Sequence, residues 1–342
     1  MNLEDIAKKA GVSRSTVSRV INDDPNVNAL TREKVWQIIR AENFHPNPSA
    51  RALVTRRTEI VGVVIPTSEN IFFTDNSYFP QLLAGLNYGT RDLEYALLLW
   101  LGELTAADDN LIRRISNNRQ MDGIIIASME GHHPFFAMIP RLRYPVVMID
   151  RPMLYEDRLS YVTVDNIAAA EMAVEHLIKL GRRRIAHITG HPNIGDAQDR
   201  LQGYKNALQR AGLPILPELI IPGHFNRNAG YDGLRQLLPH KPDAIFAAGD
   251  TIAIGILQAA RDAGLTVPDD LSVIGFDDID VASQSFPMLT TVRQPVQQKG
   301  EKAARLLIDL IEGRAIGPQH IILPTELVVR HSCGASSPLP LR

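Results

Sequence analysis

A short polar run near the amino terminus has side chains suited to reading DNA. Between Gly11 and Asn22 the sequence contains Arg14 and Arg19 and no acidic residue. An arginine can donate two hydrogen bonds to O6 and N7 of guanine, or bind a phosphate, and short hydroxyl side chains suit backbone oxygens. The run predicts these DNA-contacting residues: Ser13, Arg14, Ser15, Thr16, Ser18, Arg19 and Asn22.

A second group of side chains follows the predicted strands in the rest of the sequence. Asp150, Phe225 and Asp277 each come shortly after an apolar, strand-like run. Ligands bind beyond the carboxyl ends of the strands in open parallel sheets, so these side chains are expected to converge on one crevice. Aromatic rings stack on sugars, and Asp or Arg side chains hydrogen-bond hydroxyl groups, so the set suits a small polyhydroxylated ligand. The predicted ligand-binding residues are Tyr78, Phe79, Asp150, Asp196, Arg200, Phe225, Asp250 and Asp277.

Several of these residues also have a purely structural interpretation. For Asp250 the favoured alternative is a cap at the start of the next helix. Asp277 with Asp278 fits equally well as a pair that fixes a loop, and Asp196 fits equally well as a solvent-exposed residue. Arg200 is different, because it begins a predicted helix where a cation opposes the dipole, and this favours a functional partner.

The DNA-contacting run requires a helical scaffold, and the first 45 residues have the pattern of one. Apolar spacing predicts a helix that ends at Gly11, Ser13 is placed to cap a second helix, and a third helix is predicted over 31–42. In the second helix Val17 and Val20 share one side, which leaves the arginines on the other. The pattern predicts a helix-turn-helix with a recognition helix. The alternative is an ordinary three-helix bundle whose exposed face happens to be polar.

From Glu59 to about Arg330, short β-branched runs alternate with helical patterns. Strands are predicted over 60–65, 96–101, 123–127, 146–150, 161–164, 185–189, 218–221, 244–248, 271–276 and 290–294 and within 320–330. Helices are predicted over 79–93, 106–117, 167–180, 201–211, 228–238, 252–263 and 296–312. This alternation implies an α/β core of two doubly wound lobes, each a parallel sheet covered on both faces.

The charge of the chain is unevenly distributed. The 342 residues include 36 Lys/Arg and 38 Asp/Glu, a net charge of −2, which by itself argues against a nucleic-acid partner. However, residues 1–58 contain ten of the basic and six of the acidic residues, a net charge of +4, which leaves −6 on residues 59–342. The average therefore hides a basic segment suited to DNA.

Other features exclude whole classes of protein. A single cysteine, Cys333, rules out an intrachain disulfide and fits a reducing compartment. Apolar runs fall short of the roughly 18 residues that a membrane span needs, and the acidic amino terminus is unlike a signal peptide. The chain is therefore expected in the cytoplasm, away from membranes. No metal or cofactor is expected, because His132, His133, His187 and His191 are interpreted as surface or packing residues.

The amino-terminal motifs resemble those of the lactose/galactose-repressor (LacI/GalR) family. The resemblance rests on residues 3–13, 16–22 and 31–35, and on residues 46–53, which are similar to that family's hinge helix. It implies that Arg14 and Ser15 choose bases, that Arg19 contacts a further base, and that two hinge helices pair in the minor groove. There Ala50 and Leu53 would contact DNA, with Leu53 wedged into the central base step. The alternative for Leu53 is packing against its own core.

The resemblance also implies how the core is built and used. It implies a periplasmic-binding-protein-like core in which the chain crosses three times between the lobes. Asp150, Arg200, Phe225 and Asp277 match effector-contacting positions, and Tyr78 with Phe79 matches aromatics near the pocket mouth. Two departures leave the effector open. Gly249 stands where several sugar-binding members carry a polar side chain, and the loop over 67–77 is longer than usual.

Together these features predict four segments. They are a DNA-binding headpiece (1–45), a hinge helix and linker (46–58), a first lobe (59–160 with 291–320) and a second lobe (161–290 with 321–342). The expected protein is a homodimeric transcriptional regulator, a repressor, that binds a pseudo-palindromic operator under the control of a sugar or, alternatively, a nucleobase or other metabolite. No motif indicates whether the ligand releases or promotes DNA binding. The alternatives are a solute-binding protein of a transport system and a sugar-modifying enzyme fused to a DNA-binding unit, but no enzyme motif is present.

Overall fold

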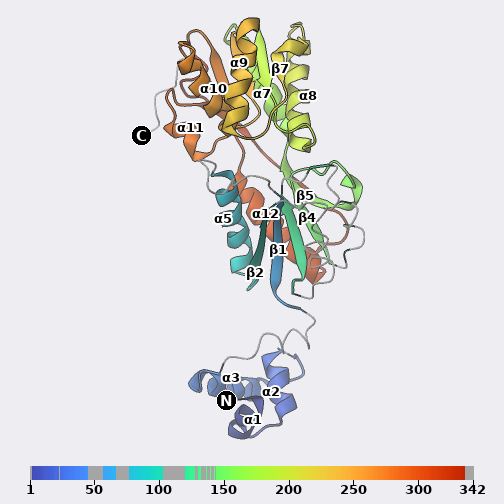
Figure 1. The fold of residues 1–342 in the computed structure, drawn as a ribbon. Coiled ribbons are helices and arrows are strands. Elements are labelled where there is room, and N and C mark those ends of the chain that lie inside the picture. The colour runs from blue at the N-terminus through green and yellow to red at the C-terminus, as the bar shows by residue number, and fades with distance from the viewer. Residues whose placement is uncertain are drawn as a thin grey trace. The chain divides into compact units, whose positions relative to one another are not determined.

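The computed structural model of the protein describes residues 2–22, 24–44, 57–66, 77–102, 120–127, 130–131, 136, 139, 142 and 144–335 (Figure 1). Its contacts divide the chain into two compact units. The first unit comprises residues 1–60 with 119–122, and the second comprises residues 61–118 and 123–342. The predicted hinge over 46–58 falls almost entirely outside the described residues, as does the helix predicted over 106–117.

The first unit contains the three predicted helices, α1 (Leu3–Ala10), α2 (Arg14–Ile21) and α3 (Ala29–Ala41). Gly11 ends α1 in the left-handed conformation, with φ of 66°, as the sequence predicts. The Ser13 side chain caps α2 by accepting a hydrogen bond from the backbone N–H of Thr16. The apolar sides of the helices enclose one small core: Ile6, Ala7, Ala10, Val17, Val20, Val35 and Ile39.

The first lobe of the second unit is built on a six-stranded sheet with the order β11-β5-β4-β3-β1-β2. These strands are β1 (Ile60–Pro66), β2 (Ala96–Gly102), β3 (Gly123–Ala127), β4 (Val146–Ile149), β5 (Ser160–Val164) and β11 (His320–Leu323). Helices α5 (Tyr78–Arg91) and α12 (Val296–Glu312) pack against each other beside the sheet. Strands β3 and β4 are buried along their whole length, as expected for a covered parallel sheet.

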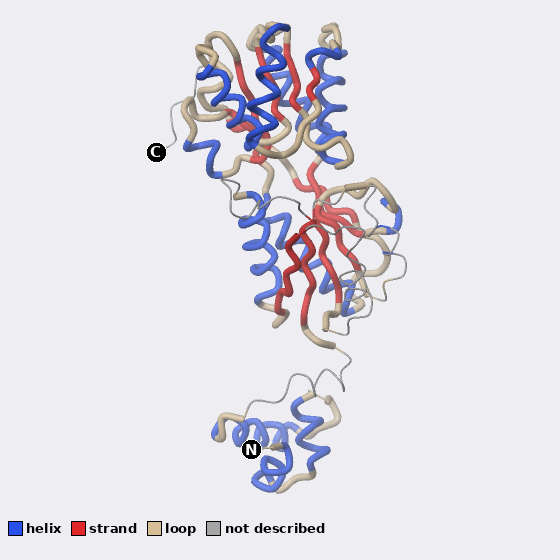
Figure 2. Tube along the Cα trace, in the orientation of Figure 1, coloured by secondary structure: helices blue, strands red, loops and turns tan. Residues whose placement is uncertain are grey.

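The second lobe contains a six-stranded sheet with the order β12-β10-β9-β8-β6-β7. Its strands are β6 (Ile185–Ile188), β7 (Ile220–Ile221), β8 (Ala244–Ala247), β9 (Ser272–Asp277), β10 (Thr290–Arg293) and β12 (Glu326–Val328). Its helices are α7 (Asn166–Lys179), α8 (Gly195–Arg210), α9 (Arg227–Leu237), α10 (Asp250–Asp262) and the short α11 (Asp280–Gln284). Figure 2 shows helices on both sides of this sheet. Strand β12 is antiparallel to β10, so the sheet is mixed at this edge.

The chain passes between the two sheets after β5, after β10 and after β11. This agrees with the three crossings that the resemblance implies. The predicted lobe boundaries are displaced, however. Residues 161–164 belong to β5, which pairs with β4 and β11 in the first sheet, and residues 291–293 pair with β9 in the second. Backbone pairing, which the linear pattern does not reveal, decides which sheet each strand joins.

Two element predictions need correction as well. Helix α8 begins at Gly195, six residues before the predicted start at 201. The prediction is late because the first turns of the helix are polar and have no apolar periodicity. The strand predicted over 218–221 is a 3-10 turn over Pro217–Leu219 followed by the short β7. None of the described helices is long and apolar enough to cross a membrane.

Candidate functional site

The exposed side of α2 presents the two predicted base-reading arginines. Val17 and Val20 are buried, whereas the side chains of Arg14 and Arg19 are 67% and 63% exposed. Arg14 Nη1 lies 3.5 Å from Glu4 Oε1, and Arg19 Nε lies 3.9 Å from an Asp24 carboxylate oxygen. Exposed ion pairs of this kind contribute little energy, so both guanidinium groups can exchange these carboxylates for DNA.

Hydroxyl groups gather at the amino-terminal end of α2. Ser13 Oγ lies 2.7 Å from Ser15 Oγ and 2.9 Å from Thr16 Oγ1. At the other end of the helix, Asn22 Nδ2 donates a hydrogen bond to Ser18 Oγ. A helix amino terminus with hydroxyl donors favours phosphate oxygens. Ala50 and Leu53, the two predicted minor-groove residues, lie outside the described part of the chain.

In the second unit, seven polar residues meet where the two lobes join, and we call them the inter-lobe cluster. The first lobe contributes Tyr78, Asp150 and Lys299, the second lobe contributes Asp196, Arg200 and Asp277, and Gln294 follows β10 in the connection to α12.

Lys299 is the centre of the first-lobe half of the cluster. Its side chain is completely buried, and Nζ donates to Asp150 Oδ1 at 2.5 Å and to Gln294 Oε1 at 2.6 Å. The Tyr78 hydroxyl lies 3.4 Å from Nζ and 3.4 Å from Asp150 Oδ2. A buried ammonium group is tolerated only with such partners, so these residues form one interdependent unit.

Arg200 is the centre of the second-lobe half. It is 3% exposed, Nε donates to Asn166 Oδ1, and Nη1 donates to the carbonyl oxygen of Ala248. The guanidinium carbon lies 3.6 Å from the centroid of the Phe276 ring. Its nitrogens also lie 3.6 Å from carboxylate oxygens of Asp196 and Asp277. Arg200 thus stacks on a ring and faces two carboxylates.

Gln294 connects the two halves. Its Oε1 accepts from Lys299 of the first lobe, and its Nε2 donates to Asp277 Oδ1 of the second lobe at 2.6 Å. Both ends of the amide are therefore committed, each to a different lobe.

Two carboxylates of the cluster stand on strained backbone. Asp150 follows β4 with φ of 72°, and Asp277, the last residue of β9, has φ of 117°. Non-glycine residues rarely adopt positive φ, and such strain concentrates at functional sites.

Burial strongly perturbs the acids of the second lobe. Together with the negative charge of Asp150, it raises the pKa of Asp196 to about 7. Burial also raises the pKa of Asp277 to about 6, against the opposing effect of Arg200. Within the described residues, Asp196 Oδ1 is buried without a hydrogen-bond partner.

The other predicted ligand-binding residues have different surroundings. Phe225 is half-buried, with its ring where a Cβ of Gly190 would stand, and lies 5.8 Å from the Arg200 guanidinium. A Cβ on Gly249 would come within 3.3 Å of the same ring, so the glycine makes room for Phe225. Phe79 packs in the hydrophobic core, edge-on to Tyr78.

Asp250 is fully buried inside the second lobe. Its carboxylate accepts from Thr291 Oγ1 at 2.6 Å and from the backbone N–H of Ile279 at 2.9 Å. The capping interpretation is wrong, because Gly249 occupies the cap position of α10. Asp250 instead anchors the segment that follows Asp277.

The structure also corrects the argument for Arg200 and adds two residues. Arg200 lies in the second turn of α8 and does not begin it, so the opposed-dipole argument does not apply. Lys299 and Gln294 are absent from the sequence prediction. Lys299 falls among the buried positions Val296, Gly300 and Ala303 of α12, and a lysine at that spacing is the signal that could have found it.

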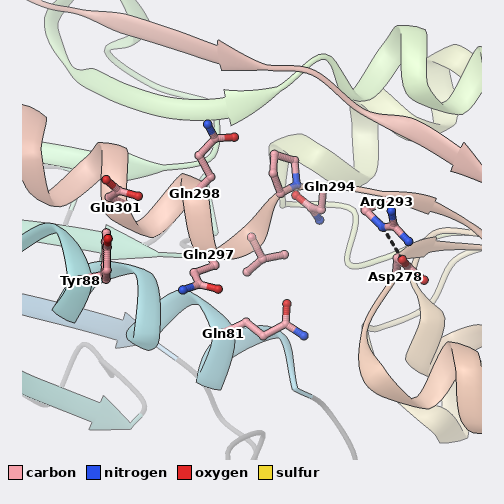
Figure 3. A pocket seen from close by; sticks show the side chains of 10 residues that line it. Gln81, Tyr88, Asp278, Arg293, Gln294, Gln297, Gln298 and Glu301 are labelled. Atoms are coloured by element: carbon pink, nitrogen blue, oxygen red, sulfur yellow. Dashed lines mark hydrogen bonds and ion pairs between the residues drawn. The ribbon is translucent and has the colours of Figure 1, made fainter.

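A separate groove of about 430 Å³ lies between α5, α12 and the end of β10 (Figure 3). Gln81 and Tyr88 line it from α5, and Gln297 and Glu301 line it from α12. Near its end Arg293 pairs with Asp278. Gln294 belongs both to this groove and to the inter-lobe cluster, but none of the predicted ligand-binding residues lines it. Within the described ranges no group of three His, Cys, Asp or Glu residues could hold a metal ion.

A helix-turn-helix unit with an exposed basic face, joined to a two-lobed α/β core, defines a class of transcriptional regulators. Residues 2–47 match the family model of bacterial regulatory proteins of the lacI family, and residues 174–333 match that of the periplasmic binding protein-like domain. The chain is 35% identical to the HTH-type transcriptional regulator CelR of Thermobifida fusca over 96% of this chain and 97% of that one. It is also 35% identical to the ribose operon repressor of Escherichia coli (strain K12), over 96% and 99% of the two chains.

Solved structures agree with these relatives. A complex of CelR with cellobiose has a TM-score of 0.77 and 34% identity, and it covers 97% of this chain and 99% of that one. The lac repressor dimer bound to operator and the anti-inducer ONPF has a TM-score of 0.81 and 27% identity, over the same shares. The chain therefore belongs to the lacI family. It is a DNA-binding transcriptional regulator, and it is neither an enzyme nor a solute-binding protein of a transport system.

Proposed function

We propose that this regulator binds a pseudo-palindromic operator as a homodimer, and that a small sugar held at the inter-lobe cluster controls its affinity for that operator. The observation that carries the proposal is the convergence of Asp150 from one lobe with Arg200 and Asp277 from the other. A ligand that contacts both lobes binds their closed arrangement better than their open one, and such differential affinity is what shifts a conformational equilibrium.

On the DNA side, Arg14 and Ser15 would choose bases in the major groove and Arg19 would contact a further base. Ser13, Thr16, Ser18 and Asn22 would hold the phosphate backbone. The exposure of Arg14 and Arg19, opposite the buried Val17 and Val20, supports this assignment. By the family resemblance, Ala50 and Leu53 would contact the minor groove, with Leu53 as the apolar wedge. Domain roles follow: residues 1–45 read DNA and residues 46–58 transmit the state of the core.

On the ligand side, Asp150, Asp196, Asp277 and Arg200 would hydrogen-bond sugar hydroxyls while the Phe225 ring stacks on the sugar face. Tyr78 would orient Asp150, Phe79 would support Tyr78, and Asp250 would position Asp277 through the loop after β9. The named ligand of CelR is cellobiose and the named operon of the Escherichia coli relative is that of ribose. These two relatives support a sugar rather than a nucleobase.

The same relatives support repression as the mode of action, since they include the ribose operon repressor and a lac repressor dimer bound to operator. A protein that acts on chromosomal operators works in the cytoplasm, which is where we place this one.

The proposal is tested by selecting duplexes from a random pool with the purified full chain. Fluorescence anisotropy on the selected operator, with and without cellobiose, ribose and other neutral sugars, then measures control by ligand. We expect a pseudo-palindromic consensus and one sugar class that changes operator affinity. Recovery of duplexes with no shared sequence would contradict sequence-specific binding, and an operator affinity that no small metabolite changes would contradict ligand control.

A further inference from the structure

The inter-lobe cluster has more acidic than basic groups. Three carboxylates, Asp150, Asp196 and Asp277, face two cations, Arg200 and Lys299. Asp199, next to the cluster, is already paired with Arg151 through two hydrogen bonds of 3.1 and 2.6 Å. Asp250, behind the cluster, is a further buried carboxylate. One negative charge of the cluster therefore remains without a matching cation among the described residues.

The hydrogen-bond pattern assigns this excess to Asp196. All three N–H groups of Lys299 are matched by acceptors, on Asp150, Gln294 and Tyr78. Two of the five Arg200 N–H groups are held by Asn166 and Ala248. Asp196 is 5% exposed. Its Oδ2 lies 3.6 Å from Arg200 Nη2, too far for a hydrogen bond, and its Oδ1 has no hydrogen-bond partner in the described part of the chain. The cluster thus has one spare acceptor, Asp196 Oδ1, and the Arg200 N–H groups that are not hydrogen-bonded already face the carboxylates of Asp196 and Asp277.

We propose that Asp196 selects the ligand by charge: in its ionised form, its Oδ1 accepts a hydrogen bond from a hydroxyl or ammonium group of a neutral or amino sugar, and its charge excludes sugar acids and sugar phosphates. This inference rests on the proposed function, because it concerns the ligand of the same cluster. A buried carboxylate without a donor is costly, and a ligand donor removes that cost, whereas a second anion beside it adds repulsion.

The perturbed titration of Asp196 gives the proposal a readout that needs no ligand. The groups that face it are Asp150 from β4, Lys299 from α12, Tyr78 from α5, and Arg200 and Asp199 from α8. Burial raises the pKa of the folded-state carboxyl from 3.8 to about 7. A carboxyl whose pKa is raised by folding destabilises the protein as pH rises from the unfolded toward the folded value, and this destabilisation persists above it.

The first experiment compares thermal unfolding of the ligand-free full chain with that of Asp196→Asn across the pH range from about 5 to about 8.5. We expect the variant to melt about 2–4 °C above the wild type at the alkaline end and to differ little at the acidic end. Asp199→Asn is the matched control, one turn further along α8, and should melt lower because Arg151 loses one of its two carboxylate partners. A variant no more stable than the wild type at the alkaline end would overturn the proposal. The pH profile of the wild type is a second readout that does not depend on the variant.

The second experiment measures binding of matched probes by calorimetry: cellobiose and cellobionate, ribose and ribose 5-phosphate, glucose, glucosamine, gluconate and glucose 6-phosphate. Where a sugar of this series binds, we expect the neutral or amino form to bind at least about 100-fold more tightly than its anionic analogue. In Asp196→Asn we expect this difference in affinity to become smaller. An anionic member that binds as tightly as its neutral parent would overturn charge selection. If that anion also changes operator affinity, the proposed function survives while this inference fails.

Discussion

At the scale of single residues, the exposed Arg14 guanidinium is the side chain whose loss should change sequence readout most directly. We expect Arg14→Ala to relax base preference at one position of each half-site and to cost about 1–3 kcal/mol in operator binding, because a bidentate contact to guanine is lost. Anisotropy titrations on the operator and on single base-pair variants measure both effects. Arg40→Ala removes the same charge from the exposed face of α3 and serves as the control. If Arg14→Ala keeps the wild-type pattern of base preferences, Arg14 does not read bases.

Arg200 is the corresponding residue on the ligand side. We expect Arg200→Met to weaken sugar binding by at least about tenfold, because a charge-assisted hydrogen bond contributes about 1.5–3 kcal/mol. The variant should also be less stable, since Asp196 and Asp277 lose their shared cation. Calorimetry with the sugar that alters operator affinity tests this. Arg210→Met is the control, because that side chain is 55% exposed at the far end of the same helix. An unchanged binding isotherm would place the ligand elsewhere.

The sequence predicts some of the site residues and misses others for identifiable reasons. Asp150 and Asp277 are predictable because each stands at or just after a strand end, and parallel strands bring such ends to one edge of a sheet. Gln294 is not, because its importance arises only when the chain crosses between the lobes. Lys299 leaves a signal, a lysine on the buried face of α12, but its partners follow only from the packing of α12 beside β4. The alternative of solvent exposure for Asp196 is wrong, because the early start of α8 buries it.

At the scale of elements, glycines allow pairs of helices to approach unusually closely. A Cβ on Gly255 of α10 would overlap the carbonyl oxygen of Arg227 at the start of α9, and one on Gly230 of α9 would overlap that of Ile252. We expect Gly255→Ala to destabilise the protein by about 1–3 kcal/mol, as overpacking does. Thermal or urea unfolding measures the change. Arg261→Ala, exposed on the same helix, should stay within about 0.5 kcal/mol of the wild type. A Gly255→Ala protein as stable as the wild type would show that α9 and α10 can move apart freely.

The elements themselves are largely predictable from local pattern. Helix α12 has the predicted bounds, Val296–Glu312, because its apolar face repeats regularly along its whole length. Helix α8 is predicted late because its first turns, from Gly195 to Arg200, are polar on the surface that faces the cluster. A functional surface replaces the apolar signal there, so the error in the prediction coincides with the site.

At the scale of the whole molecule, the charge distribution favours DNA binding by the amino-terminal segment, and the chain connections link the ligand site to both lobes. The net charge of +4 on residues 1–58 attracts DNA, and that of −6 on the remainder discourages nonspecific contacts by the core. The connection after β10 holds Gln294, which bonds to both lobes, so a ligand at the cluster acts where the chain passes between the sheets. The family resemblance then links closure of the lobes to the hinge and the operator.

The central claim, that one protein couples a sugar at the inter-lobe cluster to an operator at α2, is tested most directly by measuring the coupling from both sides. Operator affinity is measured with and without saturating sugar, and sugar affinity is measured with and without saturating operator duplex. Each pair of measurements gives one ratio of affinities. Thermodynamic linkage requires the two ratios to be equal, and couplings of this kind typically amount to about 5–150-fold. We predict equal ratios different from one in the wild type, and ratios near one in Arg200→Met at the same sugar concentration. A sugar affinity that the operator leaves unchanged would contradict the account.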